Sequence, residues 1–182
     1  MDLLKGMQVL DLADEKASFC SKLLAGFGAR VIKIERPDGD PSRDIGPFLE
    51  NSPDLEKSLY FYDNNTNKLG ITLNLEHEDG KDIFLKLLEK TDIVVEAFPP
   101  EYLEQRGLGF DVLGLRNPKV ILVSVTGFGR NDGRSLRKPC DLVTSAIGGQ
   151  MYVTGTPSTS PLKPFGDQSH YTASLFAAAG IL

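Results

Sequence analysis

The sequence contains few cysteines. Only Cys20 and Cys140 occur among its 182 residues, and their separation fits neither a metal-binding motif nor a disulfide framework. We therefore expect both thiols to be reduced, and we predict no metal site. For Cys140, a buried and unreactive thiol is favoured over a nucleophile, because thiol reactivity requires exposure and nearby positive charge.

The chain also lacks a surplus of positive charge. Its 20 Lys and Arg residues are outnumbered by 25 Asp and Glu residues, which gives a formal net charge of −5. Proteins that bind nucleic acids or anionic membranes usually need excess basic residues to neutralise phosphates, so neither partner is predicted. Residues 1–6 do not open a signal peptide, and no apolar run approaches the length of a membrane span. These absences predict a cytoplasmic protein.

A glycine fingerprint is absent where a dinucleotide would need one. Apolar periodicity predicts a strand over residues 8–13, a helix over 15–27 and a strand over 31–35, which together form a crossover unit of a parallel sheet. The sequence after the first strand is DLADEKA rather than G-x-G-x-x-G. A nicotinamide-binding Rossmann domain is therefore a disfavoured alternative.

Strand and helix patterns continue to alternate along the chain. Further strands are predicted at 70–75, 92–97 and 120–125, and further helices at 77–90, 101–106, 110–115 and 141–147. Residues 60–68 predict an aromatic and amide-rich turn, and residues 151–160 a strand followed by a loop. The pattern indicates an α/β fold with an open, mostly parallel, Rossmann-like sheet and flanking helices. We expect four strands to be buried on both faces, those around Val9, Ile32, Val94 and Ile121.

Asp167 stands where the last predicted helix begins. Pro164 and Gly166 break the chain before it, and the Ala-rich residues 168–182 follow. Such an aspartate usually caps its helix, in which case replacement by alanine would cost about 1 kcal/mol. The free N–H groups and the helix dipole would also keep a carboxylate ionised and able to attack an acyl carbon. The position of Asp167 alone leaves both roles open.

The helix over residues 168–182 is apolar on nearly every side, and the sequence ends inside it without a capping residue. An apolar helix of this kind has to pack against another segment or another chain. We therefore expect residues 1–182 to be the front part of a longer protein.

A series of short motifs runs through the chain. Each is weak alone, but their order is specific and covers nearly all 182 residues. The motifs are Gly6-x-x-Val9-Leu10-Asp11, Leu24-x-x-Phe27-Gly28-Ala29-x-Val31-Ile32-Lys33-Ile34-Glu35, Gly39-Asp40-x-x-Arg43, Asn67-Lys68, Leu73-Asn74-Leu75, Asp92-Ile93-Val94-Val95-Glu96, Asn117-Pro118, Ser124-x-Thr126-Gly127-Phe128-Gly129 and Gly166-Asp167. In this order they resemble the N-terminal portion of the class III CoA-transferase family, also called CaiB/BaiF.

The resemblance implies an activity and a domain arrangement. In the family's transferases the aspartate of the Gly-Asp step is the nucleophile, and Asp167 falls on it. The substrates would be an acyl-CoA and a carboxylic acid, with coenzyme A passing through an aspartyl-CoA thioester and no prosthetic group. Residues 1–182 would be the CoA-binding α/β domain, truncated relative to the family, with the second domain absent. The full-length protein would form an interlocked homodimer or a heteromer.

The resemblance also implies a set of contacts to coenzyme A along the edge of the sheet. The implied contacts are Lys16, Ala17, Arg36, Leu73, Asn74, Leu75, Glu76, Ala97, Phe98, Pro99, Gln105, Arg106, Lys138 and Cys140. Three of these positions depart from formyl-CoA transferase: Lys16 replaces a glutamine, Gln105 an arginine and Cys140 a tyrosine. The acyl specificity is therefore expected to differ from that of formyl-CoA transferase.

Two alternatives remain within the resemblance. Racemases of the family carry a histidine where Cys140 stands, and neither His77 nor His170 matches that position, which disfavours racemisation by a histidine and acid pair. The second alternative is a CoA-binding half or subunit that keeps the sheet but has lost turnover. Retention of Asp167 favours an enzyme, although the fragment alone is expected to be inactive.

Overall fold

Five parallel strands form the centre of the molecule. The computed structural model describes residues 2–130, 133–135 and 137–182. The strands are β1 (Gln8–Leu12), β2 (Arg30–Glu35), β3 (Leu69–Thr72), β4 (Ile93–Glu96) and β5 (Ile121–Ser124). They pair in the order β3-β2-β1-β4-β5, and every pair is parallel. The predicted open parallel sheet is confirmed.

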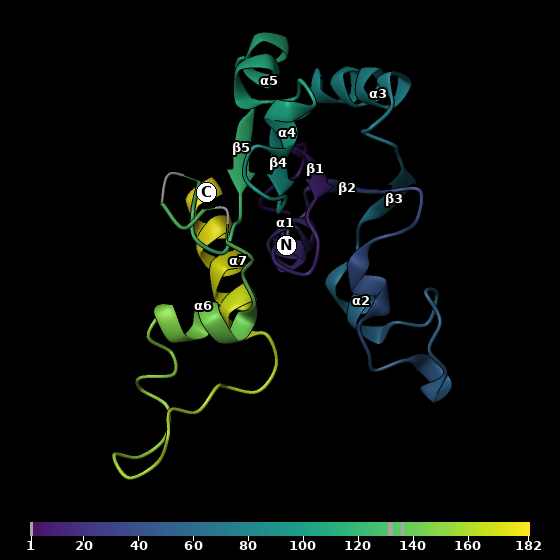
Figure 1. Cartoon of the computed structure of the whole chain (residues 1–182). Coiled ribbons are helices and arrows are strands. Elements are labelled where there is room, and N and C mark those ends of the chain that lie inside the picture. Colours follow the sequence, from purple (N-terminus) through teal and green to yellow (C-terminus); the bar gives the residue numbers. More distant parts are fainter. Residues whose placement is uncertain (1, 131–132, 136) are drawn as a thin grey trace.

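Helices connect the strands and cover both faces of the sheet. They are α1 (Ser18–Gly26), α2 (Leu59–Asn64), α3 (Glu78–Leu88), α4 (Tyr102–Gln105), α5 (Phe110–Arg116), α6 (Asp141–Ile147) and α7 (Gln168–Ile181), with two short 3₁₀ turns, η1 (Pro41–Asp44) and η2 (Leu49–Asn51). In Figure 1, α3 and α5 lie at the top, α6 and α7 at the lower left and α2 at the lower right. Among the described residues, no helix combines the length and apolarity that crossing a bilayer would require.

Side-chain alternation along the strands divides the core into two layers. Val9 is fully buried beneath α1 and α7, in a cluster with Leu24 and Ala178. The next residue, Leu10, faces the opposite layer, where Phe84 of α3 is fully buried. Successive strand residues point to opposite faces, so a strand covered on both sides has to be apolar throughout.

The burial prediction holds for β1 and β4, holds in part for β2, where Ile32 is half-buried, and fails at the edge. Val9 and Val94 have no exposed surface, whereas Ile121 is 41% exposed. The reason is the position of β5, which pairs with β4 on one side and forms the edge of the sheet on the other. An apolar strand sequence does not distinguish an edge strand from a central one.

One local prediction was right in part and another was wrong. Within residues 60–68, the amide-rich turn is present at residues 65–67, but the aromatic residues before it belong to the helix α2. The Ser58 hydroxyl caps this helix and accepts a hydrogen bond from the N–H of Phe61 at 3.0 Å. Residues 151–160, all of which the structure describes, form turns and bends rather than a strand. Among the described residues, no strand pairs with this segment, and β5 remains the edge of the sheet.

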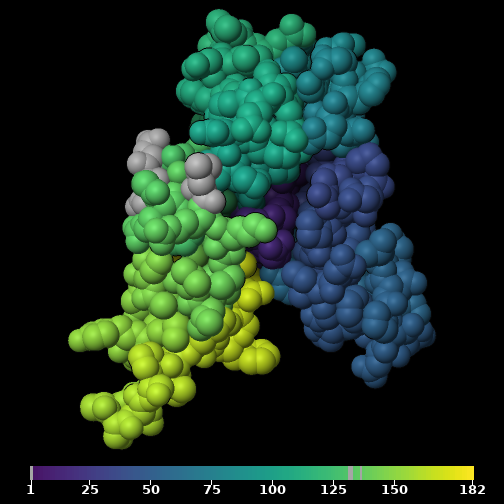
Figure 2. Space-filling model, viewed as in Figure 1, coloured from purple at the N-terminus to yellow at the C-terminus, as the bar shows by residue number. Residues whose placement is uncertain are grey.

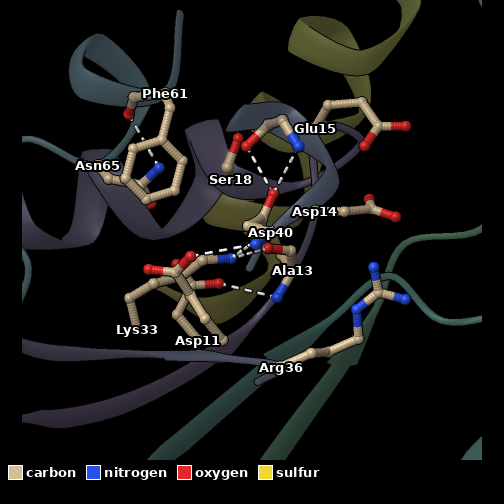
Figure 3. Close-up of polar contacts among 12 residues, drawn as sticks. Asp11, Ala13, Asp14, Glu15, Ser18, Lys33, Arg36, Asp40, Phe61 and Asn65 are labelled. Atoms are coloured by element: carbon tan, nitrogen blue, oxygen red, sulfur yellow. Dashed lines mark hydrogen bonds and ion pairs between the residues drawn. The ribbon is translucent and has the colours of Figure 1, made fainter. Parts of the chain in front are cut away.

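A network of buried charges holds the chain where it leaves β1. The carboxylate of Asp11 accepts hydrogen bonds from the N–H of Ala13 at 3.0 Å and from the Nζ of Lys68 at 2.8 Å. Lys33 pairs with Asp40 at 2.5 Å and donates to the carbonyl of Ala13. Figure 3 shows Asp11, Ala13, Lys33 and Asp40 side by side. Both backbone polar groups of Ala13 are hydrogen-bonded within this network. These bonds fix the position of the backbone at the start of residues 14–17.

Gly80 in α3 allows a close approach that a larger residue would prevent. A Cβ atom built on Gly80 would lie 1.8 Å from the carbonyl oxygen of Asn74. We therefore expect Gly80→Ala to lower the free energy of unfolding by about 1–3 kcal/mol, as overpacking does, and to displace the backbone around Asn74. Urea denaturation measures this change.

Gly114 in α5 provides the matched control, because a Cβ atom there meets nothing within 4 Å. Gly114→Ala should raise the free energy of unfolding by up to about 1 kcal/mol, the usual gain from replacing a helical glycine. If both substitutions stabilise the protein, the contact between Gly80 and Asn74 is not as tight as the structure has it.

Candidate active site

The order of the strands predicts a ligand site between β1 and β4. The chain runs from β1 to β2 and β3 on one side, and β4 and β5 lie on the other, so the strand order reverses at this point. Open parallel sheets bind ligands in the crevice at the carboxyl ends of the strands, where the order reverses. The chain segments at this edge are residues 13–17 after β1 and residues 97–100 after β4.

A pocket of about 630 Å³ lies at this edge. It brings together segments that are far apart in the sequence, and Figure 2 shows the surface hollowed between the green and yellow C-terminal part and the blue part of the chain. Six of the predicted site residues line it: Lys16, Ala97, Phe98, Pro99, Lys138 and Cys140, together with the predicted nucleophile Asp167.

A second pocket of about 300 Å³ shares the lining residue Phe98 with the first. It contains five more of the predicted contacts: Arg36, Leu73, Asn74, Leu75 and Glu76. The Arg36 side chain is about half exposed and pairs with Asp38 at 3.3 Å. In Figure 3 it stands clear of the buried charge network.

The wall of the smaller pocket contains a stack of planar groups. The rings of Phe98 and Tyr102 are stacked with their centroids 4.2 Å apart, and the guanidinium of Arg106 lies 3.5 Å from the centroid of the Tyr102 ring. Arg106 also pairs with the carboxylate of Glu76 at 2.6 Å. Arg106 does not line the pocket itself, but it contacts Tyr102 and Glu76, which do.

Besides Arg106, two predicted contacts line neither pocket. Ala17 occupies the N-cap position of α1 and is fully buried in the core cluster under that helix. Gln105 ends α4 and is exposed, but it lines neither pocket. The predicted contacts of Ala17 and Gln105 with coenzyme A therefore have no support from the lining of either pocket.

The loop that carries Lys138 and Cys140 is held against the end of β5. A Cβ atom at Gly127 would lie 2.1 Å from the Cβ of Pro139, so only glycine allows this approach. Cys140 is exposed in the pocket wall, which contradicts the expectation of a buried thiol. The buried thiol is that of Cys20, and burial, followed by the charge of Asp11, raises its pKa to about 12.

Asp167 occupies the N-cap position of α7, as predicted, but its side chain does not cap the helix. Among the residues that the structure describes, no α7 amide donates to its carboxylate. The N–H of Ser169 donates instead to Oδ1 of Asp141 at 3.0 Å, and the N–H of His170 donates to the backbone carbonyl of Asp167 at 3.0 Å. The Asp167 carboxylate is therefore not bonded to the helix and is available to a ligand in the pocket that it lines.

Other titratable groups surround Asp167. Burial, followed by Tyr171 and Asp167 itself, raises the pKa of Tyr60 well above its usual value. Burial and then Asp14 raise the pKa of Glu15, which lines the same pocket. His170 also lines it, and its Nδ1 atom is buried without a hydrogen-bond partner among the described residues.

The sequence reasoning missed several residues of this site. His170 could have been found, because a residue three positions after Asp167 lies on the same helix face. Tyr60 and Asp141 could not, because only the tertiary fold brings them to the first turn of α7. Glu15 was assigned to a helix, whereas α1 begins only at Ser18 and residues 15–17 form a turn at the pocket.

The chain is similar in sequence to known CoA-transferases. Residues 4–182 match the sequence profile of CoA-transferase family III. Subunit BbsE of succinyl-CoA:(R)-benzylsuccinate CoA-transferase from Thauera aromatica is 35% identical over 173 residues, which are 95% of this chain and 42% of that protein. Formyl-CoA:oxalate CoA-transferase from Streptomyces avermitilis is 36% identical over 180 residues, which are 98% of this chain and 43% of that protein.

The fold comparison leads to the same group. The crystal structure of a CaiB/BaiF family protein from Brucella suis matches with a TM-score of 0.89 at 31% identity, over 98% of this chain and 47% of that chain. The chain spans less than half the length of these relatives. Because the family profile covers nearly the whole chain and the parallel sheet is shared, the chain belongs to CoA-transferase family III.

Proposed function

We propose that this chain is the CoA-binding and nucleophile-bearing part of a CoA-transferase that moves coenzyme A from an acyl-CoA to a carboxylic acid. The observation that carries the proposal is the carboxylate of Asp167, which lines the larger pocket and accepts no capping hydrogen bond from α7 among the described residues. A carboxylate in this state can act as a nucleophile.

The transfer consists of two exchanges at Asp167. In the first, the carboxylate attacks the thioester carbonyl of the donor and CoA thiolate leaves, which gives a mixed anhydride. The thiolate then attacks the Asp167 carbonyl of that anhydride and releases the donor acid, leaving an aspartyl-CoA thioester. In the second, the acceptor carboxylate attacks this thioester, and the released thiolate attacks the acceptor carbonyl and frees Asp167. The thioester energy stays on the enzyme throughout.

The two pockets suit different parts of coenzyme A. Phe98 and Tyr102 offer a flat apolar surface for stacking of the adenine ring, and Arg36 supplies positive charge for a phosphate beside them. Lys16 and Lys138 line the larger pocket, where the thioester would meet Asp167. The net charge of −5 makes these local basic groups the main attraction for an anionic ligand.

The surface of α7 supports a larger assembly. The helix packs on α1, where the rings of Tyr171 and Phe19 lie 5.0 Å apart, but Leu175 is 52% exposed and Phe176 77% exposed. We expect a second domain or a partner chain to cover this face, in a homodimer or a heteromer, in the cytoplasm. The relative BbsE is itself named as a subunit.

Chemical trapping tests the proposed function. The full-length protein is incubated with succinyl-CoA or formyl-CoA, the donors in the names of its relatives, and then with hydroxylamine. An enzyme working through Asp167 should carry a hydroxamate on the peptide that contains Asp167, which mass spectrometry detects. Binding of CoA without this label would instead identify a non-catalytic CoA-binding subunit.

A second candidate function rests on His170. Its position in the same pocket as Asp167 restores a histidine and acid pair that the position of Cys140 had disfavoured, and such a pair could move the proton next to a thioester carbonyl. Incubation with a 2-methylacyl-CoA in heavy water tests this candidate. Deuterium at the α-carbon, without transfer of CoA, would favour a racemase over a transferase.

A further inference from the structure

We propose that Asp141 is a positioning residue, which takes over the capping of α7 so that the carboxylate of Asp167 stays free to react. This inference rests on the proposed function, because it assigns a role toward the nucleophile of that reaction. The carboxylate of Asp141 is supplied by α6, which begins 26 residues before Asp167 in the sequence.

The contacts of Asp141 account for the helix terminus. Oδ1 of Asp141 accepts from the N–H of Ser169 at 3.0 Å and from its hydroxyl at 2.6 Å. A helix N-cap side chain normally accepts from the second or third N–H group of its helix. Here the second is bound by Asp141, and the third, that of His170, is bound by the backbone carbonyl of Asp167. The donors that a capping Asp167 would use are therefore occupied.

Lys163 neutralises the charge of Asp141. Its Nζ lies 2.6 Å from Oδ2 of Asp141 and also donates to the carbonyl of Gly166. Burial alone would raise the pKa of Asp141, but Lys163 and Ser169 outweigh it and hold the pKa below its usual range. A second carboxylate can therefore line the pocket beside Asp167 without placing an unpaired negative charge next to an anionic substrate.

The residues between Lys163 and Asp167 complete the arrangement. Gly166 has φ = 72°, a left-handed conformation that favours glycine. Lys163 donates to the carbonyl of Gly166 and also pairs with Asp141. The turn is therefore bonded to Asp141 through Lys163 and leads directly into α7. The Gly-Asp step is thus oriented by contacts from α6 as well as by its own backbone.

Removing Asp141 should release the N–H of Ser169 and draw Asp167 into the cap. In Asp141→Ala, kcat is expected to fall about 10- to 100-fold, which corresponds to a hydrogen bond to a charged group that now holds the nucleophile. The dissociation constant of CoA should stay within about threefold, since Arg36 and Phe98 are untouched. Asp141→Asn keeps an oxygen acceptor for the N–H of Ser169 and should recover most of the rate.

A double-mutant cycle separates this role from general structural support. In the wild-type background, Asp167→Ala should leave Tm almost unchanged, because Asp167 makes no capping bond. In the Asp141→Ala background of the full-length protein, the same substitution should lower Tm by up to about 2 °C, the effect of removing one N-cap from a protein of more than 250 residues. Asp82→Asn, at an exposed position of α3, is the control for loss of a carboxylate.

The outcomes distinguish this inference from the proposed function. Equal effects of Asp167→Ala on Tm in both backgrounds, with wild-type kcat in Asp141→Ala, would overturn the positioning role and leave the transferase proposal standing. Loss of kcat in Asp141→Asn as deep as in Asp141→Ala, without coupling in Tm, would overturn it in favour of direct chemistry by Asp141. Full activity of Asp167→Ala would overturn both proposals.

Discussion

Asp167→Asn should abolish CoA transfer while leaving the fold and CoA binding intact. An amide cannot form the anhydride with the donor acyl group, so we expect kcat to fall by several orders of magnitude, as it does when other enzymes lose their nucleophile. The CoA dissociation constant should change little, because Arg36 and Phe98 lie in the adjoining pocket. Transfer between acyl-CoA and acid, followed by chromatography of the products, measures the first effect, and calorimetric titration with CoA the second.

The structure revises the effect of Asp167 on stability. A capping aspartate would make alanine cost about 1 kcal/mol, but the carboxylate makes no such bond to α7. Both Asp167→Asn and Asp167→Ala should therefore change the free energy of unfolding by less than about 0.5 kcal/mol. A cost above 1 kcal/mol for alanine alone would return Asp167 to the role of a cap, and transferase rates near normal in Asp167→Asn would require a different nucleophile.

The sequence was sufficient for the features that depend on local periodicity. The five strands follow apolar runs, and the predicted strand around Val94 is fully buried, as a central parallel strand has to be. The Gly-Asp step also located the start of α7. These predictions succeeded because neighbouring residues alone determine the strand, the turn and the beginning of the helix.

The features that the sequence did not reveal depend on distant partners. The cap of α7 comes from Asp141, and nothing around Asp167 indicates that another residue occupies the N–H of Ser169. Ile121 is an apolar residue of the kind found in protein cores. It is exposed because, among the described residues, no strand pairs with the outer side of β5. Cys140 is exposed because Gly127 and Pro139 hold its loop at the rim of the pocket.

Lys68→Met is expected to be the most destabilising single substitution among those proposed for this chain. Lys68 Nζ lies 2.8 Å from Oδ2 of Asp11, and neither side chain has more than 1% of its surface exposed. Breaking a buried ion pair by removing one partner usually costs about 3–5 kcal/mol, because the other charge stays buried. Lys68 also donates to the carbonyl of Ser18 at 2.9 Å, and that acceptor loses its donor as well.

Lys57→Met is the matched control, since Lys57 pairs with the exposed Glu50 at 3.0 Å. An exposed pair contributes about 0–1 kcal/mol, so urea denaturation should separate the two lysine variants clearly. Equal costs would show that the Asp11 site tolerates the loss of its partner. In the double variant Asp11→Asn with Lys68→Met, part of the stability should return, because no buried carboxylate is left without its lysine.

The dependence of this effect on pH follows from the carboxylate. Burial alone would raise the pKa of Asp11, but Lys68 and Lys33 outweigh it and hold the pKa below the ordinary value of 3.8. A depressed pKa contributes stability that is present above pH 3.8 and is lost as the pH falls through the lower, folded-state value. In Lys68→Met, burial acts with less opposition, so Asp11 takes up its proton at a higher pH. The stability difference between wild type and Lys68→Met should therefore be largest near neutral pH and shrink as the solution is acidified.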